Sequence, residues 1–553
     1  MKTAIVSIGA KNIHKTLAAW CIKSYCQSNG QDVEILEVNI NDSINEIVGK
    51  VFKSDPQIVG FSCYIWNIDC IAKIGGILKK LIPNIVVVLG GPEVFFEKDL
   101  SAFPFADFII RGAGEKAFYD LILSLNQNGL DNTKNAKKSN SKKIEGQSNQ
   151  IIDGCIGGFD TYPSPYTKEY FDSFALNQIP SIKNQLVYYE SSRGCPFFCS
   201  YCLSSTFSGV QYLPLDRVKS DLNLLIKNEA KCIKFVDRTF NSDKKRAANI
   251  LDFIASLDTD CVFHFEAAAD LFDQNLLNSV KNMPLNRIQF EIGIQSTNNL
   301  TLNAIGRQTD LSLVFKNIST LLSYQNCHIH VDLIAGLPLE TFETFKAAID
   351  QCINLKPHVL QIGFLKMLKG TPIRDKNDFG AVFCDHAPYE VYQTDTLKFD
   401  QIIELKQIEN ITERFFNNSA FLNTVDFGIK NSTNPYDFFK NLSDFCAKDS
   451  FNFKVSMKNA YQILYDFLIG FCDKRQVKHH IKMDCLSFDK RGLLPDCIEQ
   501  NRNKQAEIAY KKQTKTLVPF RIEFFELDGK HRLFVYDTKH PILNKYIPTI
   551  FDI

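Results

Sequence analysis

Residues 192–202 read SRGCPFFCSYC and place Cys195, Cys199 and Cys202 on one short loop directly after a strand-like run. Three thiolates at this spacing bind three corners of a cubane iron–sulfur cluster and leave its fourth iron open to another ligand. Gly194 and Pro196 suit a loop that bends tightly around a bulky inorganic group. A zinc site normally needs four ligands, and no histidine or fourth cysteine lies close by in the sequence. An ordinary four-cysteine cluster needs a distant fourth ligand, so the motif favours an open-corner cluster.

The cysteine loop opens a series of short apolar runs that alternate with helix-length segments. The expected strands are Leu186–Ser191, Cys232–Val236, Val262–Glu266, Arg287–Ile292, His328–Ile334 and Val359–Phe364. Alternation of this kind predicts parallel strands that are covered by helices. Residues 181–385 therefore predict a partial (β/α)6 TIM-like barrel, in which the chemistry lies at the carboxyl ends of the strands.

A separate βα series precedes the barrel. Its expected strands are Ala4–Ile8, Val33–Val38, Ile58–Phe61, Ile85–Leu89 and Phe108–Ile110, and its clearest helices are Thr16–Gln27 and Ile68–Leu81. Residues 1–125 thus predict a doubly wound, Rossmann-like (flavodoxin-like) domain that binds its ligand at the carboxyl ends of the strands.

Two further regions complete an α/β chain. Residues 126–180 begin with an Asn-, Lys- and Ser-rich stretch that has almost no apolar anchor, which predicts a flexible linker or connection. Residues 390–553 predict a mainly helical C-terminal accessory domain, with helices near Phe399–Phe416 and Met457–Phe471 and a terminal hairpin around Asp528-Gly529.

Composition excludes several classes of protein. The chain has 553 residues, 45% of them hydrophobic, with a formal net charge of +1, which indicates neither a nucleic-acid partner nor an anionic membrane surface. We find no signal peptide and no apolar run long enough to span a bilayer, so we expect a cytoplasmic protein without membrane contact. Its seventeen cysteines are then reduced, and most are read as small buried side chains.

The cysteine loop resembles the signature of the radical S-adenosylmethionine (SAM) superfamily, in which a Cys-x3-Cys-x-aromatic-Cys loop follows the first barrel strand. Tyr201 stands at the aromatic position, which in the family packs near the adenine of SAM. The resemblance implies that Cys195, Cys199 and Cys202 hold a [4Fe–4S] cluster whose open iron is chelated by SAM. It also implies reductive cleavage of SAM to a 5′-deoxyadenosyl radical, which abstracts hydrogen.

Later barrel motifs resemble the same superfamily. They are KFVDRTFN (234–241), FEAAADLFDQNLL (265–277), EIGIQSTN (291–298), LNAIGRQTD (302–310), DLIAGLPLET (332–341) and LKGTPIR (368–374). Arg307 suits a bidentate pair with the methionine carboxylate. The residues that the resemblance implies for SAM binding are Tyr201, Glu291, Gly293, Gln295, Ser296, Arg307, Gly336 and Pro338. Asp237 and Glu291 are equally well read as structural residues.

The N-terminal domain resembles the cobalamin-binding domain that precedes the barrel in a large subgroup of radical SAM enzymes, including bacterial members with an added C-terminal domain. The matching loops are IVGFSCYIWN (58–67), VVVLGGPEV (86–94) and FIIRGAGEKAF (108–118). The implied cobalamin contacts are Ser62, Tyr64, Trp66, Asn67, Gly90, Gly91, Glu93 and Gly112. His14 stands near the place of the cobalt-binding histidine of other cobalamin proteins, but the flanking signature residues are absent, so we expect it not to bind cobalt.

These observations predict a radical SAM enzyme that methylates a substrate or modifies it in a related way with cobalamin as an additional cofactor. Two alternatives stay open: a radical SAM enzyme without cobalamin, which inserts sulfur or rearranges its substrate, and a non-catalytic iron–sulfur redox or sensor protein. The chemistry implies a ferredoxin or flavodoxin as electron donor. The sequence identifies no catalytic side chain, substrate or oligomeric state.

Overall fold

The computed structural model describes residues 1–10, 15–128, 150–155, 158–176, 182–206, 209–448, 455–488, 494–540 and 545–552. The chain divides into two compact units. The first contains residues 1–267 with 366–378 and 382–391, and the second contains residues 268–365, 379–381 and 392–553.

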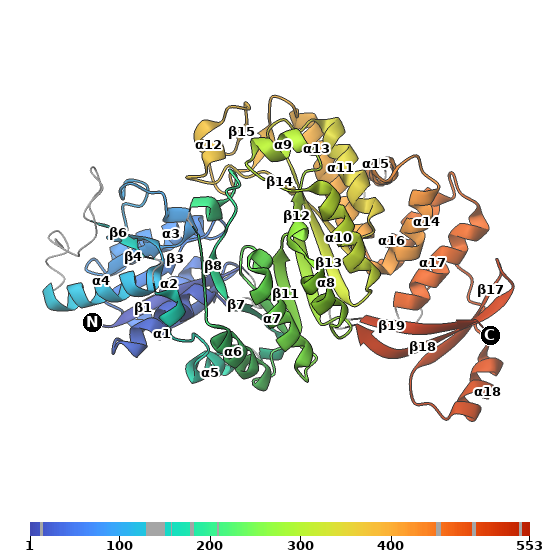
Figure 1. Cartoon of the computed structure of the whole chain (residues 1–553), viewed down its shortest axis with the longest axis horizontal. Coiled ribbons are helices and arrows are strands. Elements are labelled where there is room, and N and C mark those ends of the chain that lie inside the picture. The colour runs from blue at the N-terminus through green and yellow to red at the C-terminus, as the bar shows by residue number, and fades with distance from the viewer. Residues whose placement is uncertain are drawn as a thin grey trace. The chain divides into compact units, whose positions relative to one another are not determined.

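The first unit begins with a six-stranded parallel sheet in the order β2-β1-β3-β4-β5-β6 (Figure 1). The strands are β1 (Thr3–Gly9), β2 (Glu34–Asn39), β3 (Ile58–Ser62), β4 (Val86–Gly90), β5 (Phe108–Gly112) and β6 (Ile151–Gly154). Central β3 is buried along its whole length, because its apolar run is covered on both faces. This order is that of a flavodoxin-like sheet, whose ligands bind where the order reverses between β1 and β3.

Four helices cover the two faces of this sheet. They are α1 (Leu17–Ser28), α2 (Ile44–Ser54), α3 (Ile68–Leu81) and α4 (Gly114–Asn128). Helices α2 and α3 pack on one face through Ile47 and Ile71, and α1 and α4 pack on the other through Ala19 and Leu121. Each helix thus buries one apolar stripe on the sheet, as the sequence pattern predicts.

The later part of the stretch expected to be a linker contains regular structure that the sequence did not reveal, whereas its polar residues 129–149 lie outside the described residues. Strand β6 adds a sixth strand to the sheet, with Ile151 and Ile152 paired to Ile109 and Ile110 of β5. Helix α5 (Lys168–Leu176) follows it. Both elements are short and follow a polar run, so the sequence offers little periodicity from which to predict them.

The first unit also holds the first barrel strands, β7 (Leu186–Tyr189), β10 (Cys232–Phe235) and β11 (Val262–Ala267), which are parallel. A small antiparallel pair, β8 (Ser192–Gly194) and β9 (Val210–Tyr212), leads into and out of the cysteine loop. Helices α6 (Leu215–Lys227) and α7 (Lys244–Ser256) connect the strands, and α12 (Pro372–Lys376) and β15 (Val382–Phe383) lie in the later segments of this unit.

The second unit holds the remaining parallel barrel strands, β12 (Ile288–Gln295), β13 (Cys327–Ala335) and β14 (Val359–Phe364). Their helices are α8 (Gln274–Lys281), α9 (Asn299–Ala304), α10 (Leu311–Ser323) and α11 (Phe342–Asn354). The barrel strands run in the order β11-β10-β7 in the first unit and β14-β13-β12 in the second, so the six strands expected from the sequence are present.

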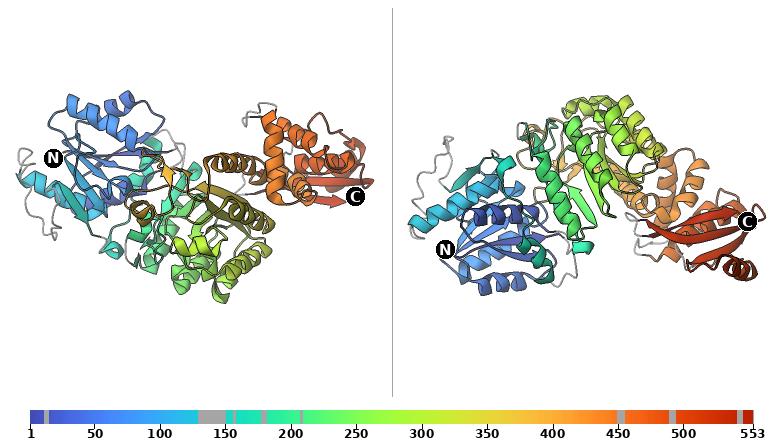
Figure 2. Two further views of the ribbon diagram at one scale, coloured as in Figure 1. Left: turned by 90° about the horizontal axis from the view of Figure 1, so that it is seen from above. Right: turned by 60° about the horizontal axis from the view of Figure 1, so that its bottom comes forward.

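The C-terminal part of the second unit is helical and ends in a three-stranded antiparallel sheet (Figure 2). Its helices are α13 (Phe399–Ile411), α14 (Leu422–Lys430), α15 (Pro435–Lys448), α16 (Met457–Leu468), α17 (Lys474–Phe488) and α18 (Lys504–Thr514). Strands β17 (Phe520–Phe525) and β18 (Lys530–His540) form the expected hairpin, and β19 (Lys545–Asp552) extends it by one strand; β16 (Val391–Gln393) pairs with β15. Among the described residues, we find no helix with the length and apolarity that crossing a membrane requires.

Candidate active site

The three predicted cluster ligands lie on the loop that follows β8. Cys195 and Cys199 are buried and Cys202 is half-buried, and all seventeen cysteines are free thiols. The backbone N–H of Cys202 donates to the carbonyl of Cys199 at 3.0 Å, which closes a turn between these two ligands. Gly194 has φ +102°, and a Cβ there would overlap the carbonyl oxygen of Gly209, so the start of this loop needs glycine.

Polar groups surround the sulfur atoms of the loop. The Sγ of Cys195 lies 3.5 Å from the hydroxyl of Thr239, and the backbone N–H of Ser204 donates to the Sγ of Cys202 at 3.4 Å. In the described ranges, no three His, Cys, Asp or Glu side chains are already gathered around one metal position. A donor set made only of sulfur, with hydroxyl and amide groups beside it, fits an iron–sulfur cluster.

The residues predicted to bind SAM from β12 and β13 lie in the second unit. Gly293 and Gln295 flank a register shift in β12, and Gln295 has φ +71°. The Nη2 of Arg307 donates to the carbonyl of Gly293 at 2.5 Å, so the structure brings these two predicted residues together. Glu291 lies on β12, and Gly336 (φ +88°) and Pro338 follow β13 at its carboxyl end. Tyr201 lies on the cysteine loop in the first unit.

Sequence reasoning missed Glu340, which holds one of these residues. The hydroxyl of Ser296 donates to the Glu340 carboxylate, and the hydroxyl of Thr344 donates to the same group. Glu340 is fully buried, and burial raises the pKa of its carboxyl group. The glutamate stands in the quoted motif DLIAGLPLET, but nothing in the local pattern indicates that it reaches back to Ser296.

The first predicted cobalamin loop follows Ser62, the last residue of β3. Asn67 is buried, and its side chain accepts from the N–H of Tyr64 at 2.7 Å and donates to the carbonyl of Ser62 at 3.0 Å. The rings of Tyr64 and Trp66 are stacked, with centroids 4.4 Å apart, and Trp66 is 49% exposed. Asn67 therefore shapes this loop, and Trp66 presents an apolar surface to solvent.

The other two predicted cobalamin loops have glycines at positions that need them. Gly91 has φ +108°, and a Cβ there would lie 2.6 Å from the carbonyl oxygen of Cys63, whose N–H donates to Gly90. Gly112 has φ +84°, and its Cβ would lie 2.9 Å from the carbonyl oxygen of Gly154. Close glycine turns beside a stacked aromatic pair whose Trp66 is exposed fit a flat macrocycle such as a corrin.

Glu93 and His14 are the two remaining residues of this domain that the sequence analysis singled out. The carboxylate of Glu93 accepts from the hydroxyl of Tyr389 and lies 3.7 Å from the Nζ of Lys369, so it faces protein groups. His14 lies outside the residues that the structure describes.

Two family models match the parts of the chain that carry these loops. Residues 189–352 match the family model described as the Radical SAM superfamily, and residues 3–122 match the B12 binding domain. Residues 189–352 therefore carry a radical SAM domain, and residues 3–122 carry a B12-binding domain. A third model, described as a protein of unknown function (DUF4080), matches residues 377–531.

Two methyltransferases are among the relatives of this chain. The 2-(S-pantetheinyl)-carbapenam-3-carboxylate methyltransferase of Streptantibioticus cattleyicolor is 23% identical over 339 residues, covering 57% of this chain and 47% of that protein. The cobalamin-dependent radical SAM methyltransferase TokK of Streptomyces tokunonensis is 24% identical over 336 residues, covering 58% and 48%. This chain thus spans about half the length of each of these two relatives.

The solved structure of the cobalamin-dependent SAM radical enzyme OxsB with aqua-cobalamin bound shares the fold, with a TM-score of 0.61 at 14% identity. The match covers 90% of this chain and 82% of that one. Together the comparisons confirm the predicted α/β architecture, in which a B12-binding domain precedes a radical SAM barrel. They also agree with the predicted cofactors: a [4Fe–4S] cluster, SAM and cobalamin.

An arginine beside the radical SAM cluster loop joins this loop to the B12-binding domain. Arg193 donates to Glu190 through Nε at 2.9 Å and to Glu115 through Nη2 at 2.8 Å. Glu115 lies in the first turn of α4, just after the Gly112 loop. The Arg193 guanidinium also lies 4.5 Å from the centre of the Phe159 ring. Sequence reasoning quoted the motifs around Arg193 and Glu115 but predicted no pairing between them.

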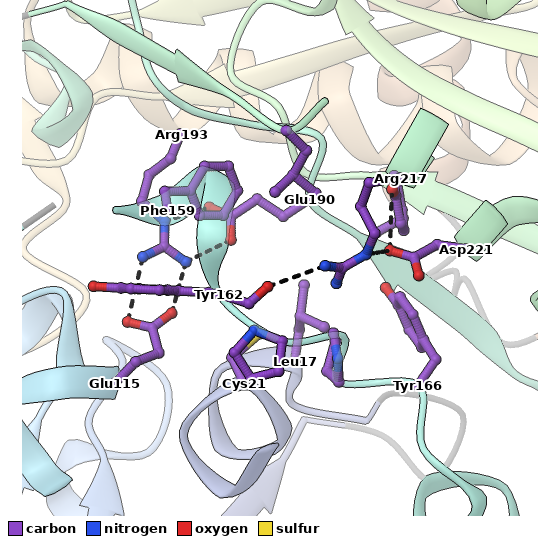
Figure 3. A pocket seen from close by; sticks show the side chains of 14 residues that line it. Leu17, Cys21, Glu115, Phe159, Tyr162, Tyr166, Glu190, Arg193, Arg217 and Asp221 are labelled. Carbon is purple, nitrogen blue, oxygen red and sulfur yellow. Dashed lines mark hydrogen bonds and ion pairs between the residues drawn. The ribbon is translucent and has the colours of Figure 1, made fainter. Parts of the chain in front are cut away.

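A small, partly open hollow lies beside this ion pair in the first unit (Figure 3). Its walls include Cys21, Tyr162 and the pair formed by Arg217 and Asp221, whose Nε and Oδ2 are 2.7 Å apart. Arg217 also donates to the carbonyl of Tyr162 at 3.0 Å. Arg193 and Arg217 are both paired with carboxylates. We therefore interpret this pocket as a junction at which segments of the first unit pack together.

Asp237, at the end of β10, holds the chain that enters the radical SAM loop. Its carboxylate accepts from the backbone N–H groups of Ser191 at 2.7 Å and Ser192 at 3.0 Å. It also accepts from the hydroxyl of Ser191. Burial raises the pKa of Asp237 to about 6, although these hydrogen bonds act to lower it. A group whose pKa is raised by folding stabilises the fold below its unfolded pKa and loses that contribution as the pH rises through its folded pKa.

We therefore expect Asp237 to contribute more stability at acid pH. When the pH falls from 7 to 5, the free energy of unfolding of the wild type should rise by roughly 1 kcal/mol relative to Asp237→Asn. Urea unfolding of both full-length proteins at the two pH values measures this difference. A constant difference between the two proteins would contradict a raised pKa at this position.

Proposed function

We propose that this protein is a cobalamin-dependent radical SAM methyltransferase, acting on a substrate that the sequence and fold do not identify. One observation carries the proposal: a sulfur-only loop and the three glycine- and aromatic-containing loops of a B12-binding domain belong to one compact unit. The similarity to two methyltransferases supports methyl transfer over other radical reactions.

The chain's own residues would bind, orient and shield the cofactors. Cys195, Cys199 and Cys202 would hold the cluster, with Asp237 fixing the strand that enters their loop. When bound, the reduced cluster would supply the electron that cleaves SAM, and cobalamin would relay the methyl group. Residues proposed to bind SAM are Tyr201, Glu291, Gly293, Gln295, Ser296, Arg307, Gly336 and Pro338.

In the B12-binding domain, Tyr64 and Trp66 would offer their stacked rings to the corrin. Gly90, Gly91 and Gly112 would allow the backbone to approach it, while Ser62 and Asn67 shape the first loop. The reducing chemistry supports a ferredoxin or flavodoxin as electron donor. Free thiols and a cluster that needs reduction support a cytoplasmic location.

Cobalamin binding tests the first part of this function. We expect the wild type to bind hydroxocobalamin, and Gly91→Ala to raise the Kd by at least about tenfold. The reason is that an alanine side chain at this position would require a strained φ and would clash with the carbonyl of Cys63. Equilibrium dialysis, read by corrin absorbance, measures both values.

A matched control is Gly76→Ala on α3, where a Cβ meets no atom within 4 Å. It should bind hydroxocobalamin as the wild type does. Methyl transfer is then tested by S-adenosylhomocysteine formation that depends on cobalamin. If 5′-deoxyadenosine forms but the wild type binds no corrin, the protein is a radical SAM enzyme without cobalamin.

A further inference from the structure

The carboxylate of Glu93 is buried beside the second cobalamin loop. Glu93 lies in the 3₁₀ turn Pro92–Val94, directly after Gly90-Gly91, and is 6% exposed. The Tyr389 hydroxyl donates to its carboxylate, and the Nζ of Lys369 lies 3.7 Å from Glu93 and 2.9 Å from Glu97. A buried carboxylate needs such partners, because an unpaired charge is costly away from water.

Both partners come from a segment more than 270 residues later, which packs tightly against the same loop. At Gly370, which has φ +71°, an added Cβ would overlap the ring of Phe96. Ala387 packs against the apolar core that contains Val94. There is thus no room for the loop to shift toward this segment.

Tyr389 is itself held in place. It is 4% exposed and has φ +59°, and the Arg374 guanidinium lies 4.8 Å from the centre of its ring. Arg374 in turn donates to the carbonyl of Met367 at 2.6 Å. The hydroxyl that reaches Glu93 therefore comes from a side chain with little freedom to move.

The same segment also contacts the cysteine loop. The backbone N–H of Ile373, in α12, donates at 3.1 Å to the carbonyl of Ser200, which lies between Cys199 and Tyr201. One stretch of chain, residues 366–391, thus bonds to the cluster loop at one point and to the Gly90-Gly91 loop at another.

We propose that residues 366–391 form a positioning strap that fixes the Gly90-Gly91 loop for cobalamin, with Glu93 acting through its bond to Tyr389. This inference rests on the proposed cobalamin function and deepens it. It assigns Tyr389, Lys369 and Glu93 as positioning residues, and it gives a role to the strap, whose later part lies in the matched DUF4080 region. Glu93, predicted from sequence as a cobalamin contact, then acts on cobalamin only through the loop that carries it.

The test compares hydroxocobalamin binding by full-length variants. Tyr389→Phe removes only the hydroxyl, and we expect it to raise the Kd for hydroxocobalamin roughly tenfold, the effect of one lost hydrogen bond to a charged group. Cluster iron content should stay at the wild-type level, because the bond from Ile373 to Ser200 is unchanged. Tyr461→Phe is the matched control, since Tyr461 is 3% exposed and its hydroxyl donates to the carbonyl of Ala420 at 2.7 Å.

A double-mutant cycle separates positioning from direct contact. If Glu93 acts through Tyr389, Glu93→Gln should weaken binding in the wild type and add little in the Tyr389→Phe background. Equal losses in both backgrounds, or wild-type affinity in Tyr389→Phe, would overturn the strap. If the wild type itself bound no hydroxocobalamin, the cobalamin function would fail first and the strap with it.

Discussion

Replacing Cys195, Cys199 and Cys202 together by alanine should remove all bound iron and sulfide from the protein. The three thiols are the proposed cluster ligands, and a cubane cannot be held once all its protein ligands are gone. Anaerobically reconstituted wild type should contain about four irons per chain and form 5′-deoxyadenosine from SAM. The variant should contain almost no iron and form no product above background, as measured by iron analysis and mass spectrometry.

The control for this variant removes three other thiols, which are half-buried. Cys384, Cys472 and Cys497 are free and partly exposed, so their replacement by alanine matches the chemical change. We expect that variant to keep its iron and its SAM cleavage. Retention of a full cluster by the Cys195/Cys199/Cys202 variant would show that the ligands lie elsewhere.

Arg193→Ala should lower the free energy of unfolding of the first unit by about 3 to 5 kcal/mol. The side chains of Glu115 and Glu190 are 6% and 19% exposed, and both lose their shared cation in this variant. Two carboxylates would then remain in a poorly solvated seam between the cluster loop and α4. Because both tryptophans, Trp20 and Trp66, lie in the first unit, tryptophan fluorescence during urea unfolding reports on this unit.

Lys116→Ala is the matched control on the same helix. Its ion pair with Asp120 is exposed, with side chains 56% and 44% accessible, so its loss should cost less than about 1 kcal/mol. If Arg193→Ala unfolded at the same urea concentration as Lys116→Ala, the buried ion pairs of Arg193 would contribute no more to the free energy of unfolding than the exposed pair of Lys116.

The strands were the elements that the sequence predicted most directly. Continuous apolar runs such as IVGFS and VVVLG are typical of strands that are buried on both faces. The positions of β3 and β4 therefore follow directly from the sequence pattern. Strand β6 was missed because it has only four residues, which follow a polar stretch and are too few to show the alternation of apolar and polar residues that indicates a strand. Strand β19 contains Pro548, which local rules read as a break but which an edge strand tolerates.

The residues of the site could be predicted only where they are close to one another in the sequence. The three cysteines share one loop, so their spacing alone indicated a cluster. The bonds that hold the site join distant positions: Arg193 and Glu115 are 78 residues apart, and Tyr389 and Glu93 are 296 apart. No local period relates such pairs, because the fold alone brings them together.

The most direct test of radical SAM chemistry is one anaerobic product assay. Reconstituted protein is given a strong reductant, SAM and hydroxocobalamin, and 5′-deoxyadenosine and S-adenosylhomocysteine are quantified by mass spectrometry beside the Cys195/Cys199/Cys202 alanine variant. We expect the wild type to form both products, and to form S-adenosylhomocysteine only when cobalamin is present. The variant should form neither product. A wild-type protein that binds no iron–sulfur cluster and leaves SAM intact would contradict the assignment.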